Sequence, residues 1–267
     1  MKGQCIGSNQ EIIKVYKVIQ DKIDSFLSYI KAIGLIATVN YIIQRYITRK
    51  EMIVLSLPGI REKIHLRRKT KDVNVFHQIF IKRDLVFLTG KDCKICIDAG
   101  ANIGLSTIFI KNLFPDAHIY SIEPEASNIE MLMLNTKGYK NITVIGKAMS
   151  VDSNGLFFVD SGNGSDSFQT VIHPIPKNDL VRINSISVNE LILQYELEQL
   201  DFVKIDIEGA EDFCINQEAM NWINRSELIA IEIHEHFVPG CTKRIRSLLG
   251  DFKFSQNGEY SIFEKLF

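Results

Sequence analysis

The sequence lacks an excess of charge of either sign. Its 267 residues include 31 lysines and arginines against 32 aspartates and glutamates, which gives a formal net charge of -1. Proteins that rely on the phosphate backbone for binding usually carry a strongly basic surface. The composition therefore argues against nucleic acid as an obligate partner.

Cysteine is also scarce. The five cysteines are Cys5, Cys93, Cys96, Cys214 and Cys241. An odd number at scattered positions does not form the disulfide framework of a small secreted protein and fits a reducing compartment. Cys93 and Cys96 form a C-x-x-C pair without a second pair, so we interpret them as ordinary thiols and not as zinc or redox ligands. The first residues lack the apolar core of a signal peptide, and we expect a cytoplasmic protein.

No apolar run approaches the ~20 residues that a membrane-spanning helix needs. Residues 10–50 instead place apolar residues at three- and four-residue spacings, which predicts two amphipathic helices broken near Gly34. We assign residues 1–51 to an N-terminal helical extension and residues 52–267 to the main domain. We expect the apolar helix faces to pack on that domain or on a second copy in a homodimer, with peripheral membrane contact as the alternative.

Ile95 to Ser106 read I-C-I-D-A-G-A-N-I-G-L-S, an apolar run that stops at Asp98 and breaks into a Gly-rich turn. Such a run predicts a strand covered on both faces, followed by the start of a helix. Gly100 and Gly104 would let a ligand approach the backbone, beside the N–H groups of the helix start. The pattern predicts a nucleotide-sized site. It lacks the third glycine of the dinucleotide fingerprint, so a plain tight turn is the alternative.

Acidic residues follow the next predicted strands. The strand at 117–124 ends in Glu123, which lies about 20 residues beyond the glycines, as expected of an acid that accepts hydrogen bonds from ribose hydroxyls. Leu200 to Glu211 read L-D-F-V-K-I-D-I-E-G-A-E, a buried strand that carries Asp206, Glu208 and Glu211 at its end. Buried carboxylates are costly, so these three either face solvent or function. For Glu211 a salt bridge or helix cap is the simpler interpretation.

A further strand is predicted at 228–236, L-I-A-I-E-I-H-E-H. It carries Glu232, His234 and His236 in alternation, which places Glu232 and His234 on one face. An imidazole beside carboxylates is suited to proton transfer or to holding a metal ion.

Four of these motifs resemble the FkbM-type methyltransferases. They are D-A-G-A-N-I-G-L-S at 98–106, I-E-P at 122–124, V-K-I-D-I-E-G-A-E at 203–211 and I-E-I-H at 231–234. The resemblance covers roughly residues 53–267. It implies a class I, Rossmann-like α/β fold, with a doubly wound, mostly parallel seven-stranded sheet and a C-terminal antiparallel hairpin. It also implies S-adenosylmethionine as cofactor and a sugar, glycan or natural-product hydroxyl as acceptor.

The strand-end pattern and the resemblance together give the candidate cofactor-binding residues. These are Asp98, Gly100, Asn102, Gly104, Ser106, Glu123, Pro124, Ala148, Met149 and Asp206. Ala148 and Met149 correspond to the segment that borders the adenine in the family. An adaptable apolar methionine suits a purine face, and a core methionine is the equal alternative.

The candidate catalytic residues are His234, Asp206, Glu208 and Glu232. An alkyl hydroxyl must lose a proton as it attacks the methyl group. In the favoured route His234 is the general base, oriented by Glu232 or Asp206. In the second route Asp206, Glu232 and His234 hold a divalent metal ion that binds the acceptor hydroxyl, which leaves Glu208 as the base.

The basic stretch at 61–71 is a solvated edge strand on the simplest interpretation. By the resemblance, Arg67, Thr70 and Asp72 lie near the entrance for cofactor or acceptor. Arg67 and Arg68 would then suit a phosphate-linked or polyanionic sugar. The family usually has Asp where this chain has Ser187, which can cap the following helix equally well.

Segments 252–255 and 260–266 predict a terminal hairpin with Asn-Gly at its turn. Such a hairpin is unusual in nicotinamide-binding domains, so it speaks against the alternative of a nicotinamide-dependent oxidoreductase. An inactive cofactor-binding protein or scaffold is the non-enzyme alternative. The acceptor itself cannot be read from the sequence.

Overall fold

A seven-stranded sheet forms the centre of the molecule. The computed structural model describes residues 5–151, 156–160, 168–171, 180–207 and 210–266. The strands of the sheet are β3 (Ile95–Ala99), β4 (His118–Ile122), β5 (Ile142–Ile145), β11 (Leu200–Ile205), β12 (Ser226–Glu232), β13 (Phe252–Asn257) and β14 (Tyr260–Lys265). Their order is β13-β14-β12-β11-β3-β4-β5. β14 is antiparallel to the other six strands, which all run in the same direction. The predicted mostly parallel sheet is confirmed.

The chain builds this sheet outward from β3 in both directions, since β4 lies on one side of β3 and β11 on the other. At such a reversal the loops after the two strands diverge and leave a crevice beyond their carboxyl ends. The Gly-rich turn follows β3, and Asp206 follows β11. The topology therefore places the predicted functional residues at this crevice.

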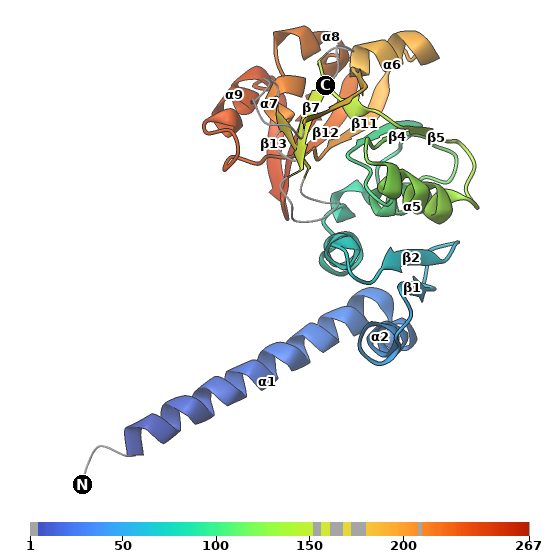
Figure 1. Cartoon of the computed structure of the whole chain (residues 1–267). Helices are drawn as coiled ribbons and strands as arrows, with labels where there is room; N and C mark the ends of the chain where they lie inside the picture. The colour runs from blue at the N-terminus through green and yellow to red at the C-terminus, as the bar shows by residue number, and fades with distance from the viewer. Residues whose placement is uncertain (1–4, 152–155, 161–167, 172–179, 208–209, 267) are drawn as a thin grey trace.

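Helices cover both faces of the sheet (Figure 1). They are α4 (Leu105–Leu113), α5 (Ala126–Thr136), α6 (Val188–Tyr195), α7 (Glu211–Cys214), α8 (Met220–Ile223) and α9 (Cys241–Leu248). The central strands alternate between two apolar cores: Phe202 belongs to one core, while Val203 and Ile205 belong to the other. Because both faces are covered, the strands read as continuous apolar runs. Ser187 caps α6 in a reciprocal capping box, as the sequence predicted.

Short strands flank the main sheet. β6 (Ala148–Met149) pairs with β10 (Ser185–Ile186), and β7 (Leu156–Asp160) pairs with β8 (Phe168–Val171) and β9 (Leu180–Ile183). The sequence also indicates short strands at 155–159 and 167–172, and they are confirmed at 156–160 and 168–171. The loop expected between them, which could cover the acceptor, lies outside the described residues.

The C-terminal hairpin is confirmed, but its turn differs from the prediction. Asn257 pairs with Tyr260 as the last pair of the ladder. The turn therefore consists of Gly258 and Glu259, with Gly258 at a φ of 56°. Glycine at the first central position is what a two-residue turn of the II′ type favours, so the glycine and not Asn257 sets the turn.

The N-terminal extension consists of α1 (Cys5–Ile33), α2 (Leu35–Ile42) and the π-helical turn η1 (Ile43–Ile47). The predicted break falls at Gly34, whose φ is 81°. Most of α1 projects away from the domain (Figure 1). Its end is anchored: Ile33 and Tyr41 are buried, and the Tyr29 ring stacks on Tyr41 with centroids 5.2 Å apart. Packing on the domain is thus confirmed only for the last turns of α1 and for α2.

A hairpin of β1 (Met52–Leu55) and β2 (Ile64–Arg67) joins the extension to the domain. The Gln44 side chain accepts from the N–H of Val54 at 2.8 Å and donates to its carbonyl at 2.7 Å. Arg68 donates to the carbonyls of Gln44, Arg45 and Lys50. The boundary at residues 51 and 52 stays a prediction.

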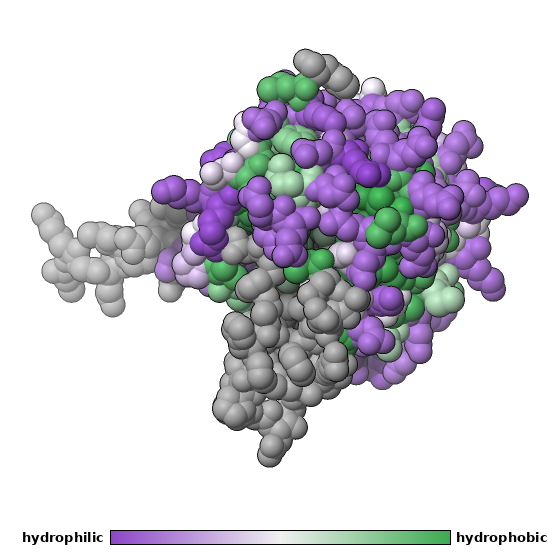
Figure 2. All heavy atoms as spheres, turned by 90° about the horizontal axis from the view of Figure 1, so that it is seen from above, coloured by the Kyte–Doolittle hydropathy of each residue, from purple (hydrophilic) through white to green (hydrophobic). Residues whose placement is uncertain are grey.

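The surface seen from above in Figure 2 is mostly polar, with small apolar patches between the polar side chains. Among the described residues, no helix is both long and apolar enough to cross a bilayer.

Gly100 offers a test of how tightly the β3 turn is packed. A Cβ at this position would lie 1.7 Å from the carbonyl oxygen of Asp206, whereas one at Gly59, which has the same φ of 76°, would meet nothing within 4 Å. We expect Gly59→Ala to cost ~1–2 kcal/mol of unfolding free energy from the left-handed backbone alone. Gly100→Ala should cost a further ~1–3 kcal/mol or more, because the backbone must shift. Urea unfolding measures both. Equal losses would contradict the close approach.

Candidate functional site

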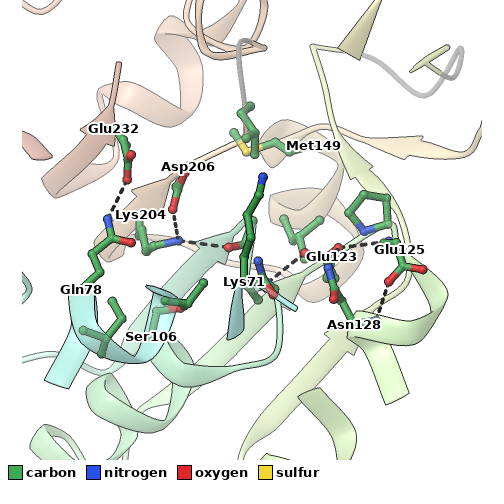
Figure 3. Close-up of a pocket in the computed structure, with 18 of the residues that line it drawn as sticks. Lys71, Gln78, Ser106, Glu123, Glu125, Asn128, Met149, Lys204, Asp206 and Glu232 are labelled. Carbon is green, nitrogen blue, oxygen red and sulfur yellow. Dashed lines mark hydrogen bonds and ion pairs between the residues drawn. The ribbon is translucent and has the colours of Figure 1, made fainter. Parts of the chain in front are cut away.

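A cavity of about 620 Å³ opens at the carboxyl ends of β3, β4, β11 and β12 (Figure 3). At each strand end one residue with a place in the sequence predictions lines the cavity: Gly100, Glu123, Asp206 and Glu232, respectively. The volume falls in the range of small-molecule and cofactor sites. In Figure 3 Glu123 lies at one end of the cavity, and Asp206 and Glu232 lie at the other.

The structure brings most of the predicted cofactor residues to this cavity. Those that line it are Gly100, Asn102, Ser106, Glu123, Pro124, Ala148, Met149 and Asp206. Asp98 and Gly104 do not line it. Gly104 serves the packing of α4 on α5 instead, since a Cβ there would lie 2.5 Å from a methyl group of Leu132.

Asp98 is fully buried beneath the cavity. Its Oδ2 accepts hydrogen bonds from the hydroxyls of Ser106 at 2.6 Å and Thr107 at 2.7 Å. Its Oδ1 lies 3.2 Å from the Nζ of Lys204. Asp98 therefore fixes the start of α4 to the sheet, and its contact with a ligand would be indirect.

Lys204 is a functional residue that the sequence analysis did not single out. Its Nζ donates to the carbonyl of Gly100 at 3.1 Å and lies 3.6 Å from Oδ2 of Asp206, in addition to its pairing with Asp98. Burial alone would lower the pKa of Lys204, but the two carboxylates outweigh it and raise the pKa above its ordinary value. A lysine within the apolar run V-K-I-D was the signal that could have revealed it.

Glu123 is buried at the end of β4. Its Oε2 accepts from the backbone N–H of Asn102 at 2.8 Å, and its Oε1 accepts from the N–H of Glu125 at 3.1 Å and the Asn128 amide at 3.3 Å. Burial raises the pKa of Glu123 to about 7, and these hydrogen bonds limit the rise. The pKa of Glu123 is higher in the folded protein than in the unfolded chain. Ionisation of Glu123 therefore lowers the stability of the fold as the pH rises through about 7.

At the opposite end, one ligand atom each of Asp206, Glu232 and His234 lie within 4.8 Å of one another. Oε2 of Glu232 accepts from the Gln78 amide at 3.0 Å, and the Tyr260 hydroxyl lies 3.5 Å from Oδ2 of Asp206. Burial, and then the negative charge of Asp206, raise the pKa of Glu232 to about 8. We call Asp206, Glu232 and His234 the acidic cluster.

The prediction for the last strand needs a correction. β12 ends at Glu232, so His234 and His236 belong to the loop that follows. The Nδ1 of His234 lies 2.7 Å from Oε1 of Glu211, which is buried, and its Nε2 lies 3.6 Å from Oε1 of Glu232. Glu211 therefore orients the imidazole, a role that we had given to Glu232 or Asp206. This contact is the salt bridge considered for Glu211 only when the imidazole is protonated.

His234 does not line the cavity but lies behind Glu232, which does. His236 is exposed, with its ring 4.0 Å from that of Phe237. Glu208 lies outside the described residues.

Residues 71–82 form a further wall that the sequence analysis missed. This segment comprises α3 (Asp72–Phe76) and the π-helical turn η2 (His77–Lys82). The polar residues that it contributes to the lining are Lys71, Asn74, His77, Gln78 and Lys82. They lie far from the strand ends in sequence, and no motif connects them to the cofactor site.

The basic residues expected near the entrance are in structural contacts instead. Arg67 forms a two-pronged ion pair with Asp72, at 2.9 and 3.0 Å, and donates to Ser127 and Asn128. Arg67, Thr70 and Asp72 do not line the cavity, although Lys71 between them does. Arg68 binds the carbonyls of the N-terminal extension. Neither arginine lines this cavity, and a phosphate-linked or polyanionic acceptor stays a prediction.

Cys93 and Cys96 are free and buried, with sulfurs 3.1 Å apart, and they lie at the opposite end of β3 from the cavity. Among the described residues, the acidic cluster is the single group that could hold a metal ion.

Comparison with known families decides between the remaining cofactor types. A model of the methyltransferase FkbM domain matches residues 98–258, more than half of the chain. The match spans the Gly-rich turn, Glu123, the end of β11 and the end of β12. The chain belongs to the FkbM methyltransferase family. It is therefore a methyltransferase that uses S-adenosylmethionine, and the nicotinamide alternative is set aside.

Solved structures show low similarity to this FkbM methyltransferase. A precorrin-6y C5,15-methyltransferase from Geobacter metallireducens has 13% identity, a TM-score of 0.39, and coverage of 69% of this chain and 88% of its own. An rRNA methylase from Streptococcus thermophilus has 13% identity, a TM-score of 0.42, and coverage of 70% and 94%. Fibrillarin from Aeropyrum pernix, solved with S-adenosylmethionine bound, has 12% identity, a TM-score of 0.39, and coverage of 66% and 67%. No curated protein matches the chain.

The cavity suits the cofactor of the family. Glu123 offers a buried carboxyl group at one end, and the apolar Met149 and Ala148 lie in the wall. Gly100 and Asn102 of the Gly-rich turn also line the cavity.

The raised pKa of Glu123 predicts how nucleoside binding depends on pH. A carboxylate accepts hydroxyl donors better than a neutral carboxyl group, so affinity should fall about tenfold from pH 8 to pH 6, across a pKa of about 7. We would measure it by calorimetry with 5′-methylthioadenosine, which carries the ribose but no group that titrates in this range. Glu123→Gln should bind more weakly and without pH dependence. A flat wild-type profile would contradict a role for Glu123 in ribose binding.

Proposed function

We propose that the protein transfers the methyl group of S-adenosylmethionine to a hydroxyl group of a saccharide or natural-product acceptor. The observation that supports this most is the chain of contacts from Glu211 through His234 to Glu232, beside Asp206. It lies at the end of the cavity opposite Glu123. If the ribose lies at Glu123, the reactive methyl group faces this cluster.

Bound S-adenosylmethionine supplies a methyl group on a positively charged sulfur. The residues of the chain must then align the acceptor oxygen with that carbon and remove its proton. Glu232 lines the cavity, so its carboxylate accepts the proton of the acceptor hydroxyl and passes it to Nε2 of His234, 3.6 Å behind it. Glu211 holds Nδ1 of the imidazole meanwhile. The oxygen–carbon bond forms as the carbon–sulfur bond breaks.

A metal-assisted route is the second candidate. Two carboxylates and an imidazole within 4.8 Å are a suitable donor set, and a bound histidine typically gives its other nitrogen to a carboxylate, as His234 does to Glu211. A divalent ion held by Asp206, Glu232 and His234 would lower the pKa of the acceptor hydroxyl. The ammonium group of Lys204, 3.6 Å from Asp206, already supplies a positive charge there. Repulsion between the two cations favours the metal-free route.

The proposed reaction is tested by methyl transfer from S-adenosylmethionine with a ¹³C-labelled methyl group. The acceptors are monosaccharides, nucleotide sugars and phenols. We expect a labelled methoxy signal in the NMR spectrum of a hydroxyl-bearing acceptor. Label found only on nitrogen or as a carboxylate ester would contradict O-methylation.

Glu211 provides a test of the base. We expect Glu211→Gln to lower kcat by roughly 100-fold or more, since an amide can hold the imidazole in the wrong tautomer. Calorimetry should show cofactor affinity changed by less than about threefold. Glu198→Gln, at an exposed glutamate, is the matched control and should behave as wild type. Unchanged turnover in Glu211→Gln would exclude His234 as the base.

Chelation separates the two routes. In the metal-free route, EDTA should leave turnover within about twofold of the untreated enzyme, and added Mg²⁺ or Mn²⁺ should not raise it. Loss of turnover in EDTA, reversed by one of these ions, would instead establish the metal-assisted route.

A further inference from the structure

The first two-thirds of α1 is a lone helix in the structure. It extends away from the domain (Figure 1), and the side chains from Lys17 to Ser28 are exposed. Its exposed apolar residues are Val18, Ile19, Ile23, Phe26 and Leu27. Isolated helices derive little stability from propensity alone and form mainly when an apolar face is covered. A helix of this length with an uncovered apolar face therefore needs a partner.

The sequence of α1 shows what kind of partner fits. Apolar residues recur at alternating four- and three-residue spacings, at Ile12, Tyr16, Ile19, Ile23, Phe26, Ile30 and Ile33. This is a heptad repeat with a period of 3.5 residues over three heptads. Such a repeat keeps one seam facing a second helix that winds around the first. A surface helix that packs on a globular domain follows the 3.6-residue period instead.

The opposite face of α1 argues against a lipid surface. It carries both signs of charge, with Lys14 and Lys17 next to Asp21 and Asp24. Helices that lie on anionic membranes carry mainly lysine and arginine on the polar face. Mixed charges around a heptad seam are typical of coiled coils.

We propose that α1 pairs with α1 of a second copy of this chain, which makes the protein a homodimer through a coiled coil. The five exposed apolar residues are Ile19, Ile23 and Phe26 of the seam, with Val18 and Leu27 beside it. At roughly 100 Å² of apolar surface each, they give about 1,000 Å² in a pair of helices. That area is about the minimum for a specific protein interface. Ile33, the last residue of the repeat, is buried in its own domain, so the part of the seam that is free to pair ends before it.

Sedimentation equilibrium of the full-length protein tests the proposal. We expect wild type to have twice the chain mass of 30.5 kDa at micromolar concentrations. Ile23→Asp introduces a charge into the seam of both helices and should weaken dimerisation by about 100-fold or more, to a monomer. Ser28→Asp introduces the same residue on the outer face and should remain dimeric. Thermal unfolding and 5′-methylthioadenosine binding should match wild type in both variants, which shows that the domain is intact.

Two results would overturn the proposal: a monomeric wild type, or an Ile23→Asp variant that remains dimeric. The exposed Ile36, Tyr46 and Ile47 of α2 and η1 are the surface that a membrane would use. Flotation with phosphatidylcholine–phosphatidylglycerol vesicles therefore accompanies the sedimentation. A monomer that floats with the vesicles would assign these helices to lipid and not to a second copy.

Discussion

The buried ammonium group of Lys204 is the contact on which the rest of the site depends. It joins Asp98 beneath the cavity, the carbonyl of Gly100 in the turn after β3, and Asp206 at the end of β11. A buried carboxylate without a counter-charge would cost several kcal/mol, so Lys204 allows Asp98 to lie buried beneath the cavity, and it also faces the half-buried Asp206. The same contact brings the ends of β3 and β11 together, which is where the sheet order reverses and the crevice opens.

From this point the cavity divides into two ends with different chemistry. At Glu123 the carboxyl group is surrounded by backbone and amide donors, an arrangement suited to binding hydroxyl groups. At Asp206 and Glu232 two carboxylates lie near a histidine whose other nitrogen is held by Glu211. The distance between the two ends is fixed by the sheet, because Glu123 and Asp206 directly follow hydrogen-bonded strands and Glu232 ends one. A rigid spacing of this kind can hold a cofactor in one orientation, with its reactive group at the acidic end.

The sequence predicted those features that depend on neighbouring residues. The apolar runs gave the strands, and Gly100, Glu123, Asp206 and Glu232 were placed correctly at their ends because each follows its strand directly. Lys204 was missed, because its role depends on the ion pair with Asp98, which lies more than 100 residues away in the sequence. The wall at 71–82 and the Glu211–His234 contact were missed for the same reason: each depends on segments that meet only in the folded chain. The heptad in α1 could be read from the sequence, but only the structure shows that its apolar face is uncovered.

A crystal structure of the protein with S-adenosylhomocysteine would test the two-ended cavity most directly. The ribose hydroxyls should lie within hydrogen-bond distance of Glu123, and the sulfur should point toward Asp206 and Glu232. A nucleoside bound at the Asp206–Glu232 end, or outside this cavity, would contradict the assignment of both ends.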